Sequence, residues 1–355
     1  MFSRGKSTRS LISIAIALML GGSSVDLSAI ALADQSETPP TILAAGAPRY
    51  LGETASDDAF FAELASANMI SFLPIFQYQE VPESQSLPRE VDYYPPCSPE
   101  EEPFRSMRLH GVKLVIPGNL LYASTLTPEE GDAYLHMLIE CAGECGIAGI
   151  FSVDEPALGN PDLDERESQV RLLYERAKAI APDIPIIMVH APIVTETLTA
   201  DGSWRPISAE EASIYLQSVA RLSLWADIVG FDLYIIPADT AKISAPGYGI
   251  EIVDYSSAIP AYLDWLQTNL PDKETLIVLQ GFAYANLLGM DQSIDAVRRP
   301  TLDELSGMAC VAWVSGVDHI GWWGQSLLGE SDAALWNDIK SVSHSISTDP
   351  VTFCQ

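Results

Sequence analysis

Short apolar runs and amphipathic segments alternate along most of the chain. The runs have the length and composition of buried β-strands, and the segments between them have helical periodicity. We predict eight strands, at Tyr50–Glu53, Met69–Phe76, Val112–Ile116, Ala148–Val153, Ile184–Val189, Ile228–Tyr234, Leu276–Gln280 and Ile320–Trp323. From the second strand onward, the runs recur at the spacing of strand-plus-helix units.

Capping signals mark where several helices begin. Thr127 precedes a proline and two glutamates, which is the pattern of an N-cap, a proline at the first helical position and acids in the first turn. Ser208 and Thr301 begin similar patterns, each with acidic residues in the following turn. We therefore expect helices to start at these three positions.

Eight strands separated by helices predict a single-domain (β/α)8 TIM barrel, spanning residues 49–355. The alternative is an open, doubly wound sheet. That fold would more often carry a glycine-rich phosphate loop after an early strand. Neither a GxGxxG nor a P-loop pattern is present, and the barrel is favoured.

The N-terminal residues have the pattern of an export signal. Arg4, Lys6 and Arg9 precede the apolar stretch Leu11–Leu20, which is too short to span a bilayer, and Ala31-Leu32-Ala33 forms a small-x-small cleavage site. We predict a secretory signal peptide over residues 1–33 and a flexible leader over 34–48. The mature protein would be secreted or periplasmic, without membrane insertion; a retained N-terminal anchor is the alternative.

Charge and cysteine content restrict the possible partners. The formal net charge of −29 excludes nucleic acid as a partner and disfavours anionic membrane surfaces. Five cysteines leave at least one thiol free or intermolecular, and Cys141 and Cys145 are expected to be buried thiols on one helix face. No spacing supports a metal site, so no metal or cofactor is expected. We expect a monomer.

Polar and aromatic residues follow the predicted strands, and in a barrel the carboxyl ends of all strands share one basin. The run that begins at Gly149 stops at two adjacent carboxylates, Asp154 and Glu155, and a later run delivers Asp232 and Tyr234. The other residues at these ends are Glu53, Gln77, Tyr78, Asn119, His190, Gln280, Tyr284, Trp322, Trp323 and Gln325. Asp227 and Asp318 lie at strand entrances and are expected to be solvated or structural.

Carboxylates and flat aromatic rings in one basin indicate sugar chemistry. Cleavage of a glycosidic bond needs one carboxyl group to protonate the leaving oxygen and a second to stabilise or attack the anomeric centre, or to activate water. We predict that Glu155 is the general acid, because desolvation behind an apolar strand can raise its pKa. Asp232 would be the second carboxylate. Asp154, expected on the other side of its strand, would support the site or serve as a structural acceptor.

The remaining residues of the basin are expected to hold the sugar. Aromatic faces would pack on the ring, and amide and imidazole groups would bond its hydroxyls. The expected substrate-binding residues are His190, Tyr234, Gln280, Tyr284, Trp322, Trp323, Gln325 and Asn119. Some of them have an alternative: His190 could be a structural histidine, and Tyr234, Trp322 and Trp323 could be ordinary core aromatics.

This layout resembles the glycoside-hydrolase superfamily of (β/α)8 barrels over nearly the whole mature chain, without identifying a family. The resemblance implies that Glu155, at the end of the fourth strand, matches the acid/base position of the large retaining clan. That clan has an asparagine before this glutamate, where this chain has Asp154. It also has a nucleophilic glutamate at the end of the seventh strand, where this chain has Gln280. An amide cannot act as that nucleophile.

Three interpretations remain open. In the first, Asp232 or Glu53 is the second carboxylate. In the second, the Asp154–Glu155 pair acts as in the hexosaminidase-type barrels that it also resembles. In those enzymes the aspartate positions a substrate acetamido group, which itself attacks. In the third, the barrel has lost catalysis and only binds glycan. We predict an exported glycoside hydrolase acting on a polysaccharide or oligosaccharide. The alternative is a non-catalytic glycan-binding or cell-surface protein on the same barrel.

Overall fold

The computed structural model describes the greater part of the chain after residue 37. The described residues are 38–45, 58–72, 104–122, 126–143, 146–159, 162–198, 204–246, 252, 254–288 and 294–355. The predicted signal peptide lies outside them. No helix in these ranges is both long enough and apolar enough to cross a membrane.

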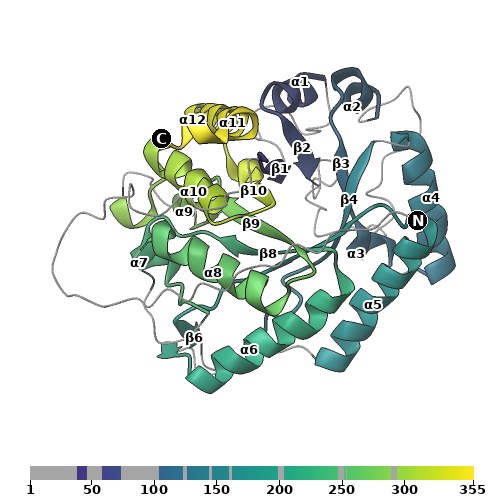
Figure 1. The fold of residues 1–355 in the computed structure, drawn as a ribbon, viewed down its shortest axis with the longest axis horizontal. Helices are drawn as coiled ribbons and strands as arrows, with labels where there is room; N and C mark the ends of the chain where they lie inside the picture. Colours follow the sequence, from purple (N-terminus) through teal and green to yellow (C-terminus); the bar gives the residue numbers. More distant parts are fainter. Residues whose placement is uncertain are drawn as a thin grey trace, which may run out of the picture. The chain divides into compact units, whose positions relative to one another are not determined.

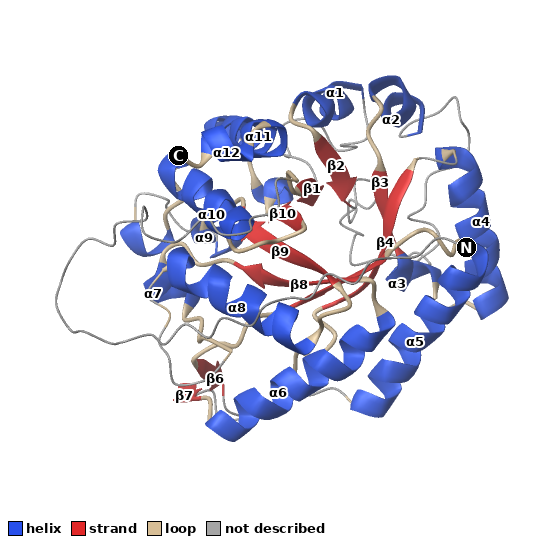
Figure 2. Cartoon of the chain, in the orientation of Figure 1, coloured by secondary structure: helices blue, strands red, loops and turns tan. Residues whose placement is uncertain are grey.

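Eight parallel strands form a closed barrel, which confirms the predicted (β/α)8 fold (Figures 1 and 2). The strands follow one another around the barrel in chain order, and the last pairs with the first. They are β1 (Thr41–Ala45), β2 (Met69–Phe72), β3 (Leu114–Pro117), β4 (Ile147–Asp154), β5 (Ile186–His190), β8 (Ile228–Leu233), β9 (Glu274–Gln280) and β10 (His319–Trp323).

The first strand is not where the sequence pattern predicts it. The structure places β1 at Thr41–Ala45, inside the predicted flexible leader, where it pairs with β10 and β2. The predicted leader boundary and first strand are therefore wrong, and Tyr50–Glu53 lies outside the described residues. A five-residue apolar segment has too little periodicity to be recognised from sequence, and its partners on both sides stabilise it as a strand.

Helices pack around the outside of the barrel (Figure 2). The longer ones are α1 (Asp58–Ser66), α2 (Phe104–His110), α4 (Pro128–Ala142), α5 (Leu163–Ile180), α6 (Ala209–Leu222), α8 (Tyr255–Asn269), α10 (Leu302–Val314) and α11 (Ala333–Thr348). The short ones are α3 (Gly118–Leu121), α7 (Ala238–Ala241), α9 (Tyr284–Leu288) and α12 (Pro350–Phe353), with 3-10 turns that include η4 (Ser223–Trp225) and η6 (Gln325–Leu327). Between β5 and α6, β6 (Glu196–Leu198) and β7 (Trp204–Pro206) form a small antiparallel pair.

The predicted helix starts are confirmed. Thr127, Ser208 and Thr301 each cap a helix, and each forms a reciprocal capping box with the glutamate three residues later. In such a box, two backbone N–H groups that would otherwise lack partners are satisfied. The local sequence therefore determines where α4, α6 and α10 begin.

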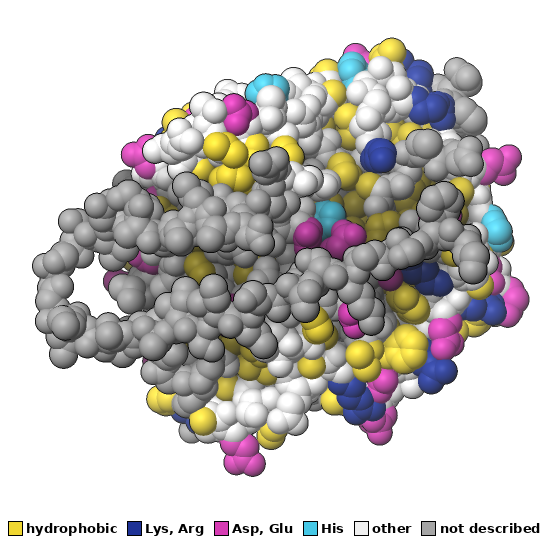
Figure 3. Space-filling view, viewed as in Figure 1, with side chains coloured by type: hydrophobic (Ala, Val, Ile, Leu, Met, Phe, Trp, Pro, Cys, Tyr) yellow, Lys and Arg dark blue, Asp and Glu magenta, His cyan; other side chains and the backbone are white. Residues whose placement is uncertain are grey.

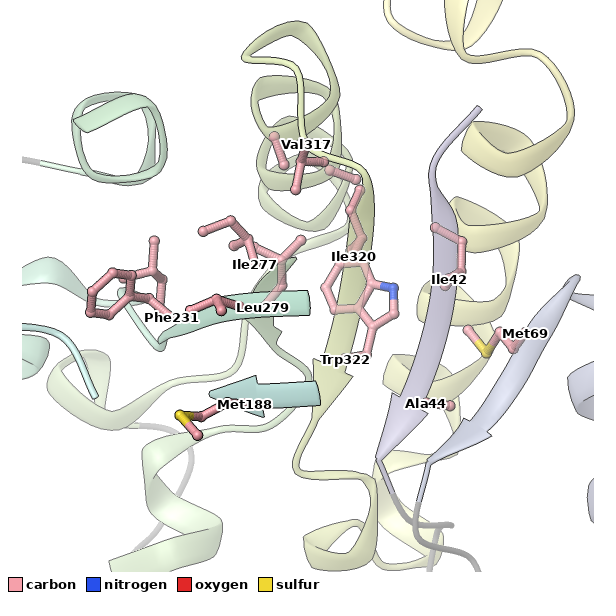
Figure 4. Packing of buried hydrophobic residues seen from close by; sticks show 14 of the residues in the cluster. Ile42, Ala44, Met69, Met188, Phe231, Ile277, Leu279, Val317, Ile320 and Trp322 are labelled. Carbon is pink, nitrogen blue, oxygen red and sulfur yellow. The ribbon is translucent and has the colours of Figure 1, made fainter. Parts of the chain in front are cut away.

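Hydrophobic side chains fill two layers, because successive residues of a strand point to opposite faces. One layer fills the barrel interior and includes Leu43, Val115, Phe151, Ile187, Val189, Ile228, Leu276 and Val278. The larger layer lies between strands and helices (Figure 4). The interior layer forms the floor on which the residues at the strand ends rest.

The acids at the strand entrances are structural, which is one of the two roles predicted for them. The Asp227 carboxylate accepts a hydrogen bond from the Ile186 N–H at 2.8 Å and pairs with Lys178 at 2.7 Å. Asp318 accepts from the N–H and hydroxyl of Thr275, at 2.7 and 2.9 Å. Both acids thus tie neighbouring strands together at the end of the barrel opposite the predicted site.

A disulfide between Cys310 and Cys354 joins α10 to the residue after α12. Cys141 is also disulfide-bonded, so the prediction that it is a buried thiol is wrong. Pairing depends on the distance and direction between two Cβ atoms, which helix periodicity alone does not reveal.

Candidate active site

A cavity of about 240 Å³ lies at the carboxyl ends of the barrel strands. Three of its lining residues are carboxylates: Asp154 and Glu155 from β4 and the residue after it, and Asp232 from β8. The other lining residues are apolar or aromatic: Leu43, Phe151, Val189, Tyr234, Leu276, Val278, Gly321, Trp322 and Trp323. The three carboxylates proposed from sequence therefore meet in one place.

An irregularity in β4 turns two adjacent carboxylates toward the same cavity. The register with β5 shifts between Phe151 and Asp154, and Glu155 adopts a left-handed backbone with φ of 42°. The Glu155 N–H donates to the Val189 carbonyl at 3.0 Å and holds this turn against β5. The prediction that Asp154 lies on the other side of the strand is wrong, because regular alternation ends before it reaches Asp154. A left-handed glutamate costs about 1–2 kcal/mol and is typical of functional sites.

Asp232 is the most enclosed of the three carboxylates, with 6% of its surface exposed. Its Oδ1 has no hydrogen-bond partner within the described residues. Burial raises the pKa of Asp232 well above its usual range; the charge of Glu155, a hydrogen bond with Glu155 and the charge of Asp154 act in the same direction. Asp232 therefore keeps a proton at pH values where an isolated aspartate would be ionised.

Asp154 is the most exposed of the three carboxylates. Desolvation of its carboxylate and the charge of Glu155 raise the pKa of Asp154 to about 6. Above pH about 6 the cavity therefore holds an ionised Asp154 close to Asp232, which keeps its proton to higher pH than an ordinary aspartate. Environments that separate the protonation states of neighbouring carboxyl groups are typical of acid/base sites.

Aromatic rings form one wall of the cavity. Tyr234 and Trp323 stack with centroids 5.1 Å apart, and the edge of Phe282 packs against both. The Tyr284 hydroxyl donates to the Tyr234 carbonyl at 2.5 Å and fixes the segment after β8. Burial and the charge of Asp232 raise the pKa of Tyr234, so its phenol stays neutral. Sequence reasoning missed Phe282, although it directly follows β9 and a glycine.

The two adjacent tryptophans separate to opposite faces of β10. Trp323 packs with the barrel-interior layer, whereas the fully buried Trp322 belongs to the layer between strands and helices, near Ile42 and Ile320 (Figure 4). Trp322 borders the cavity without exposed surface. The pair is thus not one platform, because successive strand residues alternate.

His190 does not line the cavity. Its ring is fully buried, and its Nε2 lies 3.0 Å from the Ser223 hydroxyl, which itself donates to the Val219 carbonyl. Nε2 is therefore the donor in this contact. Burial lowers the pKa of His190 to about 3, so the ring is neutral. These contacts favour the structural alternative over the predicted contact with sugar.

Gln280 also turns away from the cavity. Its amide nitrogen donates to the carbonyls of Ile236 and Phe282 at 2.7 and 3.0 Å, and its oxygen accepts from the Ile236 N–H at 2.8 Å. A glutamate here could accept from Ile236 but could not donate to either carbonyl when ionised. The amide is needed to hold the segment that follows Tyr234, and its predicted role in binding sugar is not supported.

Six further residues are predicted at the strand ends. Tyr284 does not line the cavity but donates a hydrogen bond to the carbonyl of Tyr234. Gln325 is fully buried, and neither of its amide atoms has a hydrogen-bond partner among the described residues. Asn119 lies in α3, with its side chain outside the description, and Glu53, Gln77 and Tyr78 lie outside the described residues. Sequence reasoning also missed the apolar floor, which the alternation along each strand would have indicated.

In the described part of the chain, no three His, Cys, Asp or Glu side chains are arranged to hold a metal ion.

The fold is similar to solved enzyme structures, although no protein-family model matches the chain and no curated protein matches its sequence. A putative alpha-L-fucosidase from Bacteroides thetaiotaomicron VPI-5482 is 11% identical, with a TM-score of 0.53 over 88% of this chain and 98% of that one. An endo-beta-1,4-mannanase from Thermotoga petrophila is 12% identical, with a TM-score of 0.49 over 88% and 78%. At 11% identity, the similarity to the putative fucosidase supports a shared (β/α)8 fold and nothing more specific.

Proposed function

We propose that this protein is a glycoside hydrolase that cleaves glycosidic bonds in a polysaccharide or oligosaccharide. One observation carries the proposal: three carboxyl groups, among them Asp154 and Asp232 with raised pKa values, share a cavity with a stacked tyrosine and tryptophan. Glycosidic cleavage requires a proton donor and an ionised carboxylate on either side of a sugar ring. The solved barrel named as a fucosidase adds support at the level of fold analogy.

The Asp232–Glu155 pair is the proposed source of the proton. Asp232 is buried at the cavity wall, whereas Glu155 is only partly buried and is the member nearer to solvent. We assign Glu155 as the general acid that reaches the leaving oxygen. Asp232, whose raised pKa keeps a proton on it above the usual range of an aspartate, would supply that proton through its hydrogen bond with Glu155.

Asp154 is the proposed ionised carboxylate. Above pH about 6 it carries the negative charge that would stabilise the positive charge developing at the anomeric carbon. Tyr234 and Trp323 would pack against the ring face. This chemistry requires no cofactor, and the predicted export by residues 1–33 suits a polymeric substrate.

Gln280 favours one alternative, a barrel that binds glycan without cleaving it. Its fully bonded amide occupies the position from which the large retaining clan supplies a nucleophile. Product release by the purified protein across a broad panel of polysaccharides tests both proposals. New reducing ends from any glycan support hydrolysis. Binding without product from every glycan favours the non-catalytic protein.

Activity should depend on pH with two limbs. We expect kcat/KM to fall as pH drops through about 6, because protonation of Asp154 removes its charge. It should fall again at higher pH, where Asp232 loses its proton. In Asp154→Asn the residual activity should lack the acidic limb near pH 6. An acidic limb unchanged in this variant would contradict the role of Asp154.

A further inference from the structure

The cavity has an excess of negative charge that no side chain balances. None of the described residues that line it is Lys, Arg or His, yet three are carboxylates. Burial raises the pKa values of Asp154 and Asp232, and the charge of Glu155 raises both further; the charge of Asp154 also raises that of Asp232. A neutral sugar would leave this repulsion in place, whereas a positively charged group would relieve it.

One of the carboxylates that line the cavity has an unpaired oxygen. Asp232 is more than nine-tenths buried, and its Oδ1 has no hydrogen-bond partner among the described residues. A buried carboxylate oxygen without a donor is costly, and a ligand that supplies an N–H group would satisfy it. An ammonium group provides three donors and a charge of the required sign.

The aromatic rings of the cavity and the net charge of the protein also favour a positively charged ligand. Tyr234 and Trp323 line the cavity beside the carboxylates, and the faces of such rings attract cations. The net charge of −29 would also attract a positively charged polymer. Acidic side chains of the described residues are scattered over the face in Figure 3 and form no single patch there. We therefore attribute the long-range attraction to the net charge of the whole protein, and the selectivity for one sugar to the carboxylates of the cavity.

We infer that the cavity is selective for a sugar with a free, protonated amino group, as in a polymer of glucosamine. This inference rests on the proposed function for its sugar, and the charge of the cavity provides the selectivity. The small cavity, about 240 Å³, suits one sugar ring better than a larger ligand. In this arrangement the ammonium group would lie between Asp154 and Asp232.

Calorimetric titration of the wild-type protein with three monosaccharides tests the inference without requiring catalysis. The probes are D-glucosamine, D-glucose and N-acetyl-D-glucosamine at about pH 6.5, where Asp154 is largely ionised and an amine of ordinary pKa is protonated. We expect the Kd of glucosamine to be at least about tenfold lower than those of the neutral sugars, with the preference weakening as salt rises. Equal affinities, or tighter binding of a neutral sugar, would overturn the inference.

Two variants separate the cavity from the general charge of the protein. Asp154→Asn should bring the three affinities close together, whereas Glu140→Gln, an exposed position on α4 with the same change in charge, should leave the preference intact. A preference that survives Asp154→Asn, or that Glu140→Gln removes equally, would contradict the inference. Selective binding of glucosamine with no hydrolysis of any glycan would support this inference while refuting the proposed enzyme.

Discussion

Replacing Glu155 by glutamine should lower kcat/KM by about 10²–10⁴-fold, the usual contribution of a general acid. Glutamine has nearly the same shape but cannot transfer a proton to the leaving oxygen. The loss should be much smaller for aryl glycosides with acidic phenol leaving groups, which depart without protonation. Initial rates on a cleavable polysaccharide and on such an aryl glycoside, measured with the same enzyme preparation, provide the comparison.

The exposed Glu140→Gln variant is the matched control, and it should keep wild-type rates because Glu140 does not line the cavity. The thermal unfolding of Glu155→Gln should remain cooperative, which separates lost chemistry from lost fold. Near wild-type rates in Glu155→Gln would refute its assignment as the acid. An equal loss on both substrate types would instead indicate that Glu155 acts at another step.

Replacing Asp232 by asparagine should abolish most activity and at the same time stabilise the protein at alkaline pH. The pKa of Asp232 is raised in the folded state, so between its ordinary value and the folded value the folded protein binds more protons than the unfolded chain. Its contribution to stability is therefore fully present at low pH and is lost as pH rises through the folded pKa. Asparagine carries no charge and avoids this loss.

Urea unfolding at about pH 5 and about pH 8 measures the effect. We expect a gain on the order of 1 kcal/mol for Asp232→Asn at the higher pH, the scale of a single stabilising substitution, and a smaller gain at the lower pH. Asp264→Asn, at an exposed position on α8, should show no such pH dependence. Equal unfolding free energies of wild type and Asp232→Asn at both pH values would refute a buried, proton-retaining Asp232.

The two effects expected for Asp232→Asn, lost activity and increased stability, have the same origin. On this prediction the site retains a buried carboxyl group without which the folded protein would be more stable. Glu155 adds backbone strain, since its φ of 42° lies in the left-handed region. The proposed function would account for features that stability alone would disfavour.

Local sequence determined much of the architecture. Apolar runs of strand length alternate with capped amphipathic helices, and each signal acts over a few residues, so the barrel and the starts of α4, α6 and α10 follow from pattern. The carboxylates Asp154, Glu155 and Asp232 could be gathered by the same reasoning, because a barrel brings all its strand ends together.

Tertiary structure decided the direction of each side chain and the partners it meets. The shifted register of β4 turns Asp154 into the cavity. Alternation along β10 places Trp322 on the outer face of the barrel. The amide of Gln280 is hydrogen-bonded to backbone groups of other segments. His190 is neutral because residues distant in sequence bury it, and β1 exists because β10 and β2 pair with it. Orientation, burial and pairing depend on neighbours brought together by folding, so local periodicity cannot specify them.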